Sequence, residues 1–333
     1  YVKNVTEEIA KNLHRGQMVI LESTTYPGTT REVILPILEC SGLVAGRDFY
    51  LGHSPERVDP GNKDHSIKNT PKIVGGIDAE STRMLALLYS HITDKVVTVS
   101  SAQTAELTKV FENVFRNINI ALVNELATLC EHMGISVWEV ISAAATKPYG
   151  FMPFYPGPGV GGHCIPVDPY YLASKAKEFD FHTRFIELAG EINDRMPYNV
   201  VSRTMEILNN DGKCLKGAKV LVLGVTFKKE VVDIRESPSI KLVKLLLEKE
   251  ATLSYNDPYV KQIKIGKNTL SSVEINSQSL SKADCVIIAT DHTSYDYRYI
   301  VENASLVFDT RGVTRIIGSK HIVRLGEPMF LEG

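Results

Sequence analysis

The sequence has almost no net charge and no segment suited to crossing a membrane. Its 37 lysines and arginines nearly cancel its 39 aspartates and glutamates, so no global field would recruit nucleic acid or an anionic membrane surface. No apolar run approaches the roughly 20 residues that a bilayer crossing needs, and residues 1–17 have the pattern of an amphipathic helix rather than a secretory signal. We expect a soluble, cytoplasmic protein whose partners are small molecules or proteins.

Cysteine is also sparse. The five cysteines are scattered through the chain without any C-x-x-C pair, at positions Cys40, Cys130, Cys164, Cys214 and Cys285. An odd number at irregular spacing argues against a disulfide framework, and the absence of paired ligands argues against a structural zinc site. The pattern therefore predicts a reducing compartment and no metal site.

The first hundred residues lack a G-x-G-x-x-G turn between a strand and a helix. They nevertheless alternate helix and strand patterns, with strands expected within 18–24, 49–54, 72–76 and 95–100, and this alternation predicts a mostly parallel sheet. An open α/β domain usually begins with a strand, whereas this chain begins with a helix pattern. We therefore expect the first, nucleotide-binding half of the domain to be missing from the sequence.

A long helix and a second α/β region follow. Residues 101–133 hold apolar residues at helical spacing without proline or glycine, and further helices are expected at 136–146 and 169–209. From residue 211 onward, continuous apolar strands alternate with helices, which is typical of a parallel sheet buried on both faces. The predicted fold class is α/β, with two Rossmann-like parallel-sheet domains joined by a long central helix and the first domain truncated. The expected domain boundaries are 1–100, 101–210 and 211–333.

The stretch "GPGVGGHCIPVDP", residues 157–169, places one cysteine among four glycines and flanking prolines. Glycine permits positive φ and close backbone approach, and proline stiffens the flanks, so the stretch predicts a shaped loop. A lone cysteine is usually a small buried hydrophobe. Here the glycines, the adjacent His163 and the nearby Asp168 favour an exposed nucleophile at Cys164.

Other polar side chains occupy positions where helices and parallel sheets bind ligands. Lys109 and Asn113 share one face of the long helix, where they form either a solvated stripe or an oxyanion-stabilising pair. Glu56 and Arg57 in "HSPERVDPGN", and Thr24 in "ESTTYPGTT", each follow a strand. Both a surface turn and a ligand crevice are expected at such strand ends.

Basic residues gather at two strand ends of the second α/β region. Lys228, Lys229 and Arg235 follow its first strand and precede a helix, and Arg311 lies in "FDTRG" at the end of another strand. They belong either to solvated loops or to a site that converges on one diphosphate.

Six segments, in their order along the chain, resemble the UDP-glucose/GDP-mannose dehydrogenase family: "STTYPGTT", "SPERVDPG", "AELTKVFENVFRNINIALVNE", "GPGVGGHCIPVDP", "GVTFKKEVVDIRESPS" and "FDTRG". The resemblance covers essentially the whole chain and is most like the UDP-N-acetylglucosamine 6-dehydrogenase branch. It implies oxidation of the C6 alcohol of a UDP-sugar to a carboxylate with two NAD, through a cysteine thiohemiacetal and a thioester. It also implies a place in surface polysaccharide synthesis, and a homodimer or higher homo-oligomer is expected from the apolar face of the long helix.

The resemblance further implies roles for individual residues. Cys164 would be the nucleophile, and Lys109 and Asn113 would stabilise the oxyanion. The other implied assignments are Asp168 for proton transfer, Glu56 as the base for thioester hydrolysis, Thr24 for the water and the cofactor, Arg57, Gly161, Lys228 and Arg311 for the substrate, and Arg235 for the cofactor.

Two features depart from the family pattern. Family members carry further residues at the amino end, including the G-x-G-x-x-G turn that holds NAD, so residues 1–333 alone are expected to bind NAD poorly and to have little or no activity. The pair Asp59-Pro60 stands where UDP-glucose-specific relatives place another glutamate, which argues against UDP-glucose. The alternatives left open are a UDP-N-acetylmannosamine or UDP-glucose 6-dehydrogenase, a non-catalytic UDP-sugar-binding dimer module, and a cysteine acyltransferase or hydrolase that pairs a histidine with Cys164.

Overall fold

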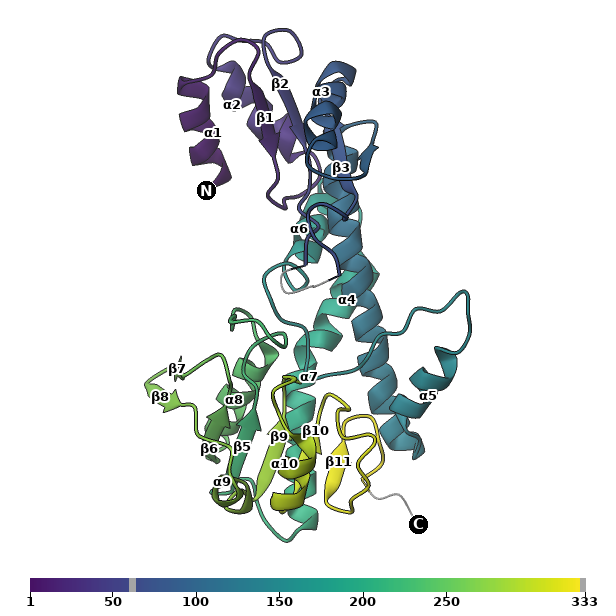
Figure 1. Cartoon of the computed structure of the whole chain (residues 1–333), viewed down its shortest axis with the longest axis vertical. Coiled ribbons are helices and arrows are strands. Elements are labelled where there is room, and N and C mark those ends of the chain that lie inside the picture. Colours follow the sequence, from purple (N-terminus) through teal and green to yellow (C-terminus); the bar gives the residue numbers. More distant parts are fainter. Residues whose placement is uncertain (60–63, 330–333) are drawn as a thin grey trace. The chain divides into compact units, whose positions relative to one another are not determined.

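The computed structural model describes residues 1–59 and 64–329, so the Pro60 of the sequence motif lies outside the described residues. The chain forms two compact units (Figure 1). The first unit comprises residues 1–115 and 167–184, and the second comprises residues 116–166 and 185–333.

The first unit is built on a four-stranded sheet with strand order β1-β2-β3-β4. The pairs β1/β2 and β3/β4 are parallel and β2/β3 is antiparallel, so the predicted parallel sheet carries one antiparallel pair. Helices α1 and α2 cover one face around buried Leu38 and Phe49, and α3 covers the other around Leu85. The elements are α1 Val2–Lys11, β1 Met18–Leu21, the π-helix η1 Thr30–Ile34, α2 Leu35–Glu39, β2 Tyr50–His53, β3 Lys72–Gly76, α3 Ala79–Ser90, β4 Val96–Thr98 and α6 Asp168–Lys177.

The second unit contains an entirely parallel five-stranded sheet with strand order β11-β10-β9-β5-β6. Side chains alternate along β5, so Val220 and Val222 pack beneath α7 and α8 while Leu221 and Leu223 pack beneath α9 and α10. This burial on both faces confirms the prediction from the apolar strands. The elements are α5 Val137–Ala144, α7 Arg184–Asn210, β5 Lys219–Leu223, α8 Pro238–Glu248, β6 Thr252–Asn256, β7 Gln262–Ile265, β8 Asn268–Ser271, α9 Ser277–Ser281, β9 Cys285–Ile288, α10 Tyr297–Asn303, β10 Val307–Asp309 and β11 Ile322–Arg324.

The long helix α4 runs from Ala102 to Met133, as the sequence predicts. Ser101 caps its start, because the Ser101 hydroxyl accepts a hydrogen bond from the Thr104 N–H, and Gly134 follows its end with φ +73°. The single helix expected over 169–209 was wrong. Two helices, α6 and α7, form there, and the intervening segment contains Asp180 with φ +55°, a conformation that cannot continue a right-handed helix.

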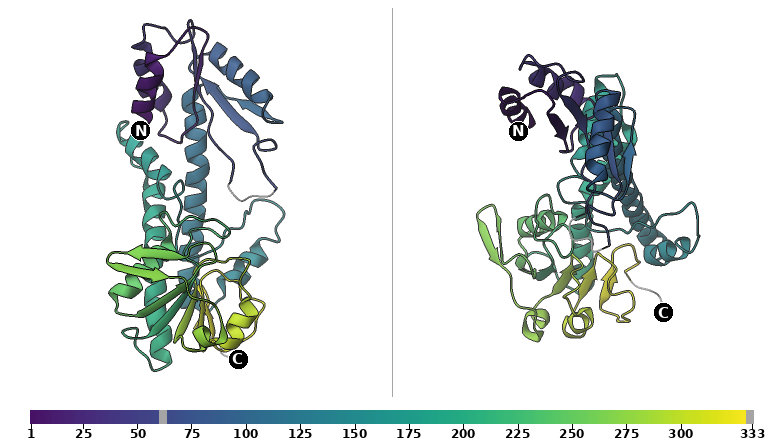
Figure 2. Two further views of the ribbon diagram at one scale, coloured as in Figure 1. Left: turned by 60° about the vertical axis from the view of Figure 1, so that its left-hand side comes forward. Right: turned by 45° about the horizontal axis from the view of Figure 1, so that its top comes forward.

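A buried chain of amides joins α4 to α7, which run side by side in the second unit (Figure 2). Asn193 donates to the backbone and side-chain oxygens of Asn117 at 3.0 and 2.8 Å and accepts from Asn124 at 2.9 Å. Asn124 in turn accepts the backbone N–H of Gly157 at 3.0 Å. The recurrence of asparagine along α4 therefore reflects buried hydrogen bonds, not a solvated face.

We predict that Asn193→Ala destabilises the second unit. The substitution leaves buried groups of Asn117 and Asn124 without partners, which costs about 1–3 kcal/mol of unfolding free energy. Urea unfolding would measure the loss, with the exposed Asn209→Ala on the same helix as a control that changes stability by less than about 0.5 kcal/mol. Equal stability of the two variants would contradict this role.

Candidate functional site

The glycine-rich loop lies against the segment that follows β5 in the second unit. The Gly162 N–H donates to the Arg235 carbonyl at 3.2 Å. A Cβ atom placed on Gly161 would lie 2.7 Å from side-chain atoms of both Phe227 and Pro238, so only glycine fits there. The loop displays Cys164 at the surface, as predicted for an accessible thiol.

A cation lies within electrostatic range of this thiol. Arg235 pairs with Asp233 at 2.7 Å, and this hydrogen bond and charge raise the pKa of Arg235. The negative form of Cys164 contributes to the same rise. Arg235 therefore lies close enough to Cys164 for the charges of the two side chains to interact.

A cavity of about 600 Å³ opens beside the same loop in the second unit. The rings of Trp138 and Tyr155 form one wall, with centroids 6.2 Å apart and an interplanar angle of 15°. The cationic side chains Lys229, Arg311 and Arg315 form other parts of the lining. The cavity therefore offers flat apolar surface and positive charge, the two features that a nucleotide needs.

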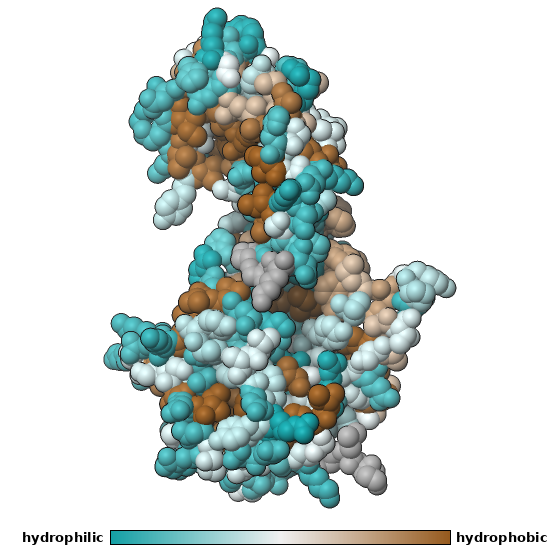
Figure 3. Space-filling view, in the orientation of Figure 1, coloured by the Kyte–Doolittle hydropathy of each residue, from teal (hydrophilic) through white to brown (hydrophobic). Residues whose placement is uncertain are grey.

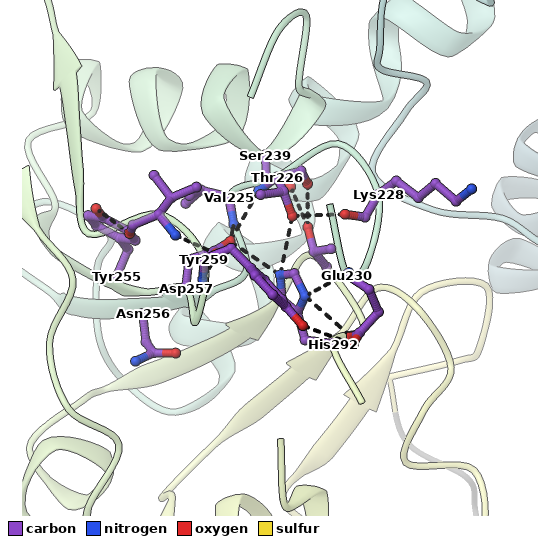
Figure 4. Close-up of polar contacts among 12 residues, drawn as sticks. Val225, Thr226, Lys228, Glu230, Ser239, Tyr255, Asn256, Asp257, Tyr259 and His292 are labelled. Atoms are coloured by element: carbon purple, nitrogen blue, oxygen red, sulfur yellow. Dashed lines mark hydrogen bonds and ion pairs between the residues drawn. The ribbon is translucent and has the colours of Figure 1, made fainter. Parts of the chain in front are cut away.

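The loop that carries Lys228 and Lys229 is fixed by a buried polar cluster, shown in Figure 4. His292, which is fully buried, contacts Asp257 through Nε2 at 3.2 Å and accepts the Glu230 backbone N–H through Nδ1 at 3.3 Å. In the close-up, the Lys228 side chain extends away from this cluster. Nothing in the sequence pattern pointed to His292, because its partners lie far away along the chain.

Asp257 completes this anchor. Its carboxylate accepts the backbone N–H groups of Val225 and Thr226 at 2.8 and 3.2 Å. Burial alone would raise the pKa of Asp257, but the hydrogen bonds from His292 and Val225 outweigh burial and lower it. At this strand end a dinucleotide-binding domain presents its N–H groups to phosphate, whereas here the chain's own carboxylate occupies them.

In the first unit the structure joins two of the predicted residues directly. Asn113 is buried on α4 and donates to the Asp168 carboxylate at 2.7 Å, and Asp168 is itself buried at the start of α6. Lys109 lies one turn before Asn113 and is half-buried. Arg57 instead pairs with Glu112, at 2.8 Å, within the same unit.

Glu56 belongs to a charge cluster that the sequence did not reveal. Lys72, whose side chain is 10% exposed, lies 3.4 Å from Glu56 and 3.1 Å from Glu22. Tyr89 donates to Glu22 at 2.6 Å. Lys72 is the first residue of an otherwise apolar strand, and this single charge was the available signal.

These charges shift the pKa values of their neighbours. Partial burial would raise the pKa of Glu56, but the Val58 N–H, the Lys72 charge and the Arg57 N–H outweigh it, so the pKa falls. Burial, and next the Lys72 charge, lower the pKa of His53 to about 4. Glu56 is therefore ionised at neutral pH and His53 is neutral.

The loop after β1 contains Thr24, which is half-buried, and Thr25, whose buried hydroxyl has no hydrogen-bond partner within the described part of the chain. Glu106 on α4 fixes the end of this loop by accepting the N–H and the hydroxyl of Thr30 at 2.8 and 2.6 Å. Across residues 1–59 and 64–329 no group of three or more His, Cys, Asp and Glu side chains is arranged to hold a metal ion. Nor does any helix in these ranges combine the length and hydropathy of a membrane span.

Comparison with known proteins identifies three consecutive domains of one family. Residues 1–93 match the NAD binding domain of the UDP-glucose/GDP-mannose dehydrogenase family, residues 103–195 match its central domain, and residues 221–316 match its UDP binding domain.

Individual relatives agree with these matches. Protein CapL of Staphylococcus aureus is 38% identical, with 92% of this chain and 74% of that protein covered. UDP-N-acetyl-D-glucosamine 6-dehydrogenase of Pseudomonas aeruginosa is 39% identical, with 87% and 68% covered. The solved structure of UDP-D-ManNAc dehydrogenase from Pyrococcus horikoshii superposes with a TM-score of 0.87 at 32% identity, with 99% of this chain and 77% of that one covered. The chain thus spans about two thirds to three quarters of these relatives.

We predict that Lys72→Met raises the pKa of Glu56. Removing the ammonium takes a stabilising charge from the ionised carboxylate, so Glu56 would hold its proton to a higher pH. NMR titration of protein labelled with ¹³C at the glutamate carboxyls would measure this, with Glu56→Gln to assign the signal. Lys72→Arg keeps the charge and serves as the control, and an unshifted Glu56 signal in Lys72→Met would show that Lys72 has no such effect.

Proposed function

Because this chain belongs to the UDP-glucose/GDP-mannose dehydrogenase family, we propose that it oxidises C6 of UDP-N-acetylglucosamine to the uronic acid with NAD. The observation that carries the proposal is the exposed Cys164 thiol on a loop whose neighbouring residues line a basic, aromatic cavity. The N-acetylated sugar is favoured because two of the relatives just described, those from Pseudomonas aeruginosa and Pyrococcus horikoshii, are named as dehydrogenases of UDP-N-acetylhexosamines. The uronic acid would supply surface polysaccharide synthesis.

Covalent capture accounts for the thiol. Bound NAD supplies the acceptor for the two hydrides that leave C6. Between the two oxidations the Cys164 sulfur would hold the aldehyde carbon as a thiohemiacetal, which keeps the aldehyde from escaping. After the second oxidation the same sulfur would hold the acyl carbon as a thioester, and hydrolysis would regenerate the thiol.

The first-unit residues would manage charge and protons in these steps. Lys109 and Asn113 would stabilise the developing oxyanion, and Asp168, oriented by the Asn113 amide, would move the proton. Glu56, which is ionised at neutral pH, would deprotonate the hydrolytic water. Thr24 would hold that water.

Each nucleotide would occupy a different group of residues. The half-buried Thr24 and the unpartnered hydroxyl of Thr25 fit a polar group of NAD at the end of β1, and Arg235 would also face the cofactor. The UDP part of the substrate would enter the cavity, with Arg311 and Lys228 at the diphosphate. Tyr155, which is 49% exposed, would offer a stacking surface for uracil.

A second copy of the chain would cover the apolar surface of the long helices. Leu122, Leu129 and Met133 on α4 are 51–62% exposed, and Phe185 on α7 is 77% exposed. Leu122 and Leu129 also line a groove of about 510 Å³ between α4 and α7. Figure 3 shows apolar residues among the polar ones on one face of the molecule. The exposed apolar side chains of α4 and α7 are of the kind that is typical of interfaces. We propose a homodimer through α4 and α7.

A non-catalytic UDP-sugar-binding module is the second candidate. It is favoured by the position of the cavity, whose lining comes wholly from the second unit. Calorimetry on the intact protein, with any amino-terminal residues beyond this sequence included, separates the two candidates: UDP binding without NAD binding would support the module, and binding of both would support the enzyme.

We predict that Cys164→Ser abolishes uronate formation, because a hydroxyl is a much weaker nucleophile than a thiolate. A panel of UDP-N-acetylglucosamine, UDP-N-acetylmannosamine and UDP-glucose, with NADH measured per sugar consumed, should give two equivalents with the preferred sugar. The exposed Cys214→Ser in the second unit is the matched control and should keep wild-type turnover. Unchanged turnover in Cys164→Ser would remove the covalent mechanism.

A further inference from the structure

One carboxylate faces the cations of the nucleotide cavity. Asp291 follows β9, and its Oδ1 lies 3.2 Å from Nε of Arg311 while its Oδ2 lies 3.7 Å from Nζ of Lys229. Its side chain is 21% exposed and lines the cavity. Each oxygen of Asp291 therefore faces a different cation.

We propose that Asp291 is an internal counter-anion that opposes the incoming diphosphate, and that it sets both the affinity of the cavity and its preference for nucleotides over simple anions. The proposal rests on the proposed function, since it assumes that a nucleoside diphosphate enters this cavity. A diphosphate that contacts Arg311 and Lys229 must approach Asp291 and take over its ion pairs. Like charges at such distances repel strongly where solvent is partly excluded.

The cations are held in place by groups other than Asp291. The backbone N–H of Arg311 donates to the Asp309 carboxylate at 2.9 Å, which fixes the start of the side chain. The tip of the Arg311 side chain lies against Gly157. The loop of Lys229 is anchored through Glu230 and His292 (Figure 4). Because these anchors persist without Asp291, its removal should strengthen anion binding rather than disorganise the site.

The field of Asp291 also reaches the cavity wall. Burial, and next the Asp291 charge, raise the pKa of Tyr297, which lines the same cavity. A nucleotide gains contact with the exposed ring of Tyr155 in addition to the cations, whereas pyrophosphate gains only the cations. Repulsion by Asp291 therefore removes a larger fraction of the binding free energy of a simple anion such as pyrophosphate than of a nucleotide.

Calorimetry on the whole chain tests the inference, with UDP and with pyrophosphate as ligands. In Asp291→Asn, UDP should bind on the order of tenfold more tightly, and the ratio of UDP affinity to pyrophosphate affinity should fall. Asp291→Ser removes the same charge with a smaller side chain and should behave alike, which protects the test against a folding defect in one variant. The control is Asp284→Asn, because Asp284 precedes β9 at the opposite end of the strand and pairs with Lys213.

Weaker or unchanged UDP binding in both Asp291 variants would overturn the inference and assign Asp291 to positioning Arg311. Tighter binding in Asp284→Asn as well would reduce the effect to net charge and also overturn it. Absence of UDP binding in the wild type would instead overturn the proposed function, together with the inference that rests on it.

Discussion

The close packing of the glycine-rich loop against the second α/β sheet is the constraint on which the rest of the structure depends. Gly161 approaches Phe227 and Pro238 so closely that no other residue fits, and the tip of the Arg311 side chain lies beside Gly157. The loop therefore carries the thiol towards one end and borders the basic, aromatic cavity at the other. The buried amide of Asn124 ties this loop to the long helix. One short segment thus positions both the thiol of Cys164 and one border of the cavity proposed to bind the nucleotide.

In both units, most of the charged candidate residues form a hydrogen bond or an ion pair with another residue of the same unit. Asp168 is held by Asn113, and Lys72 lies between two carboxylates, one of them Glu56. In the second unit, Arg311 and Lys229 share Asp291. Buried or half-buried charge is tolerated only with such partners. A ligand that enters must therefore exchange one set of ion pairs for another, and this exchange is a source of selectivity.

The sequence predicted the features that depend on local pattern. The four strands of the first unit, the long helix, the exposure of Cys164 and the cationic strand end at Arg311 follow from periodicity, glycine content and position. The residues it missed, Lys72, His292 and Asp291, act through partners far away along the chain. The residues next to them in the sequence do not indicate contacts of this kind. The break between α6 and α7 was also missed, because it turns on the backbone of one aspartate rather than on a proline or glycine.

Acid-quench mass spectrometry of the intact protein during turnover with UDP-N-acetylglucosamine and NAD tests the central claim most directly. We expect a covalent sugar-nucleotide adduct on the peptide that contains Cys164, and we expect this adduct to disappear when the reaction runs to completion. Uronate formation with no adduct, or with an adduct on another cysteine, would contradict it.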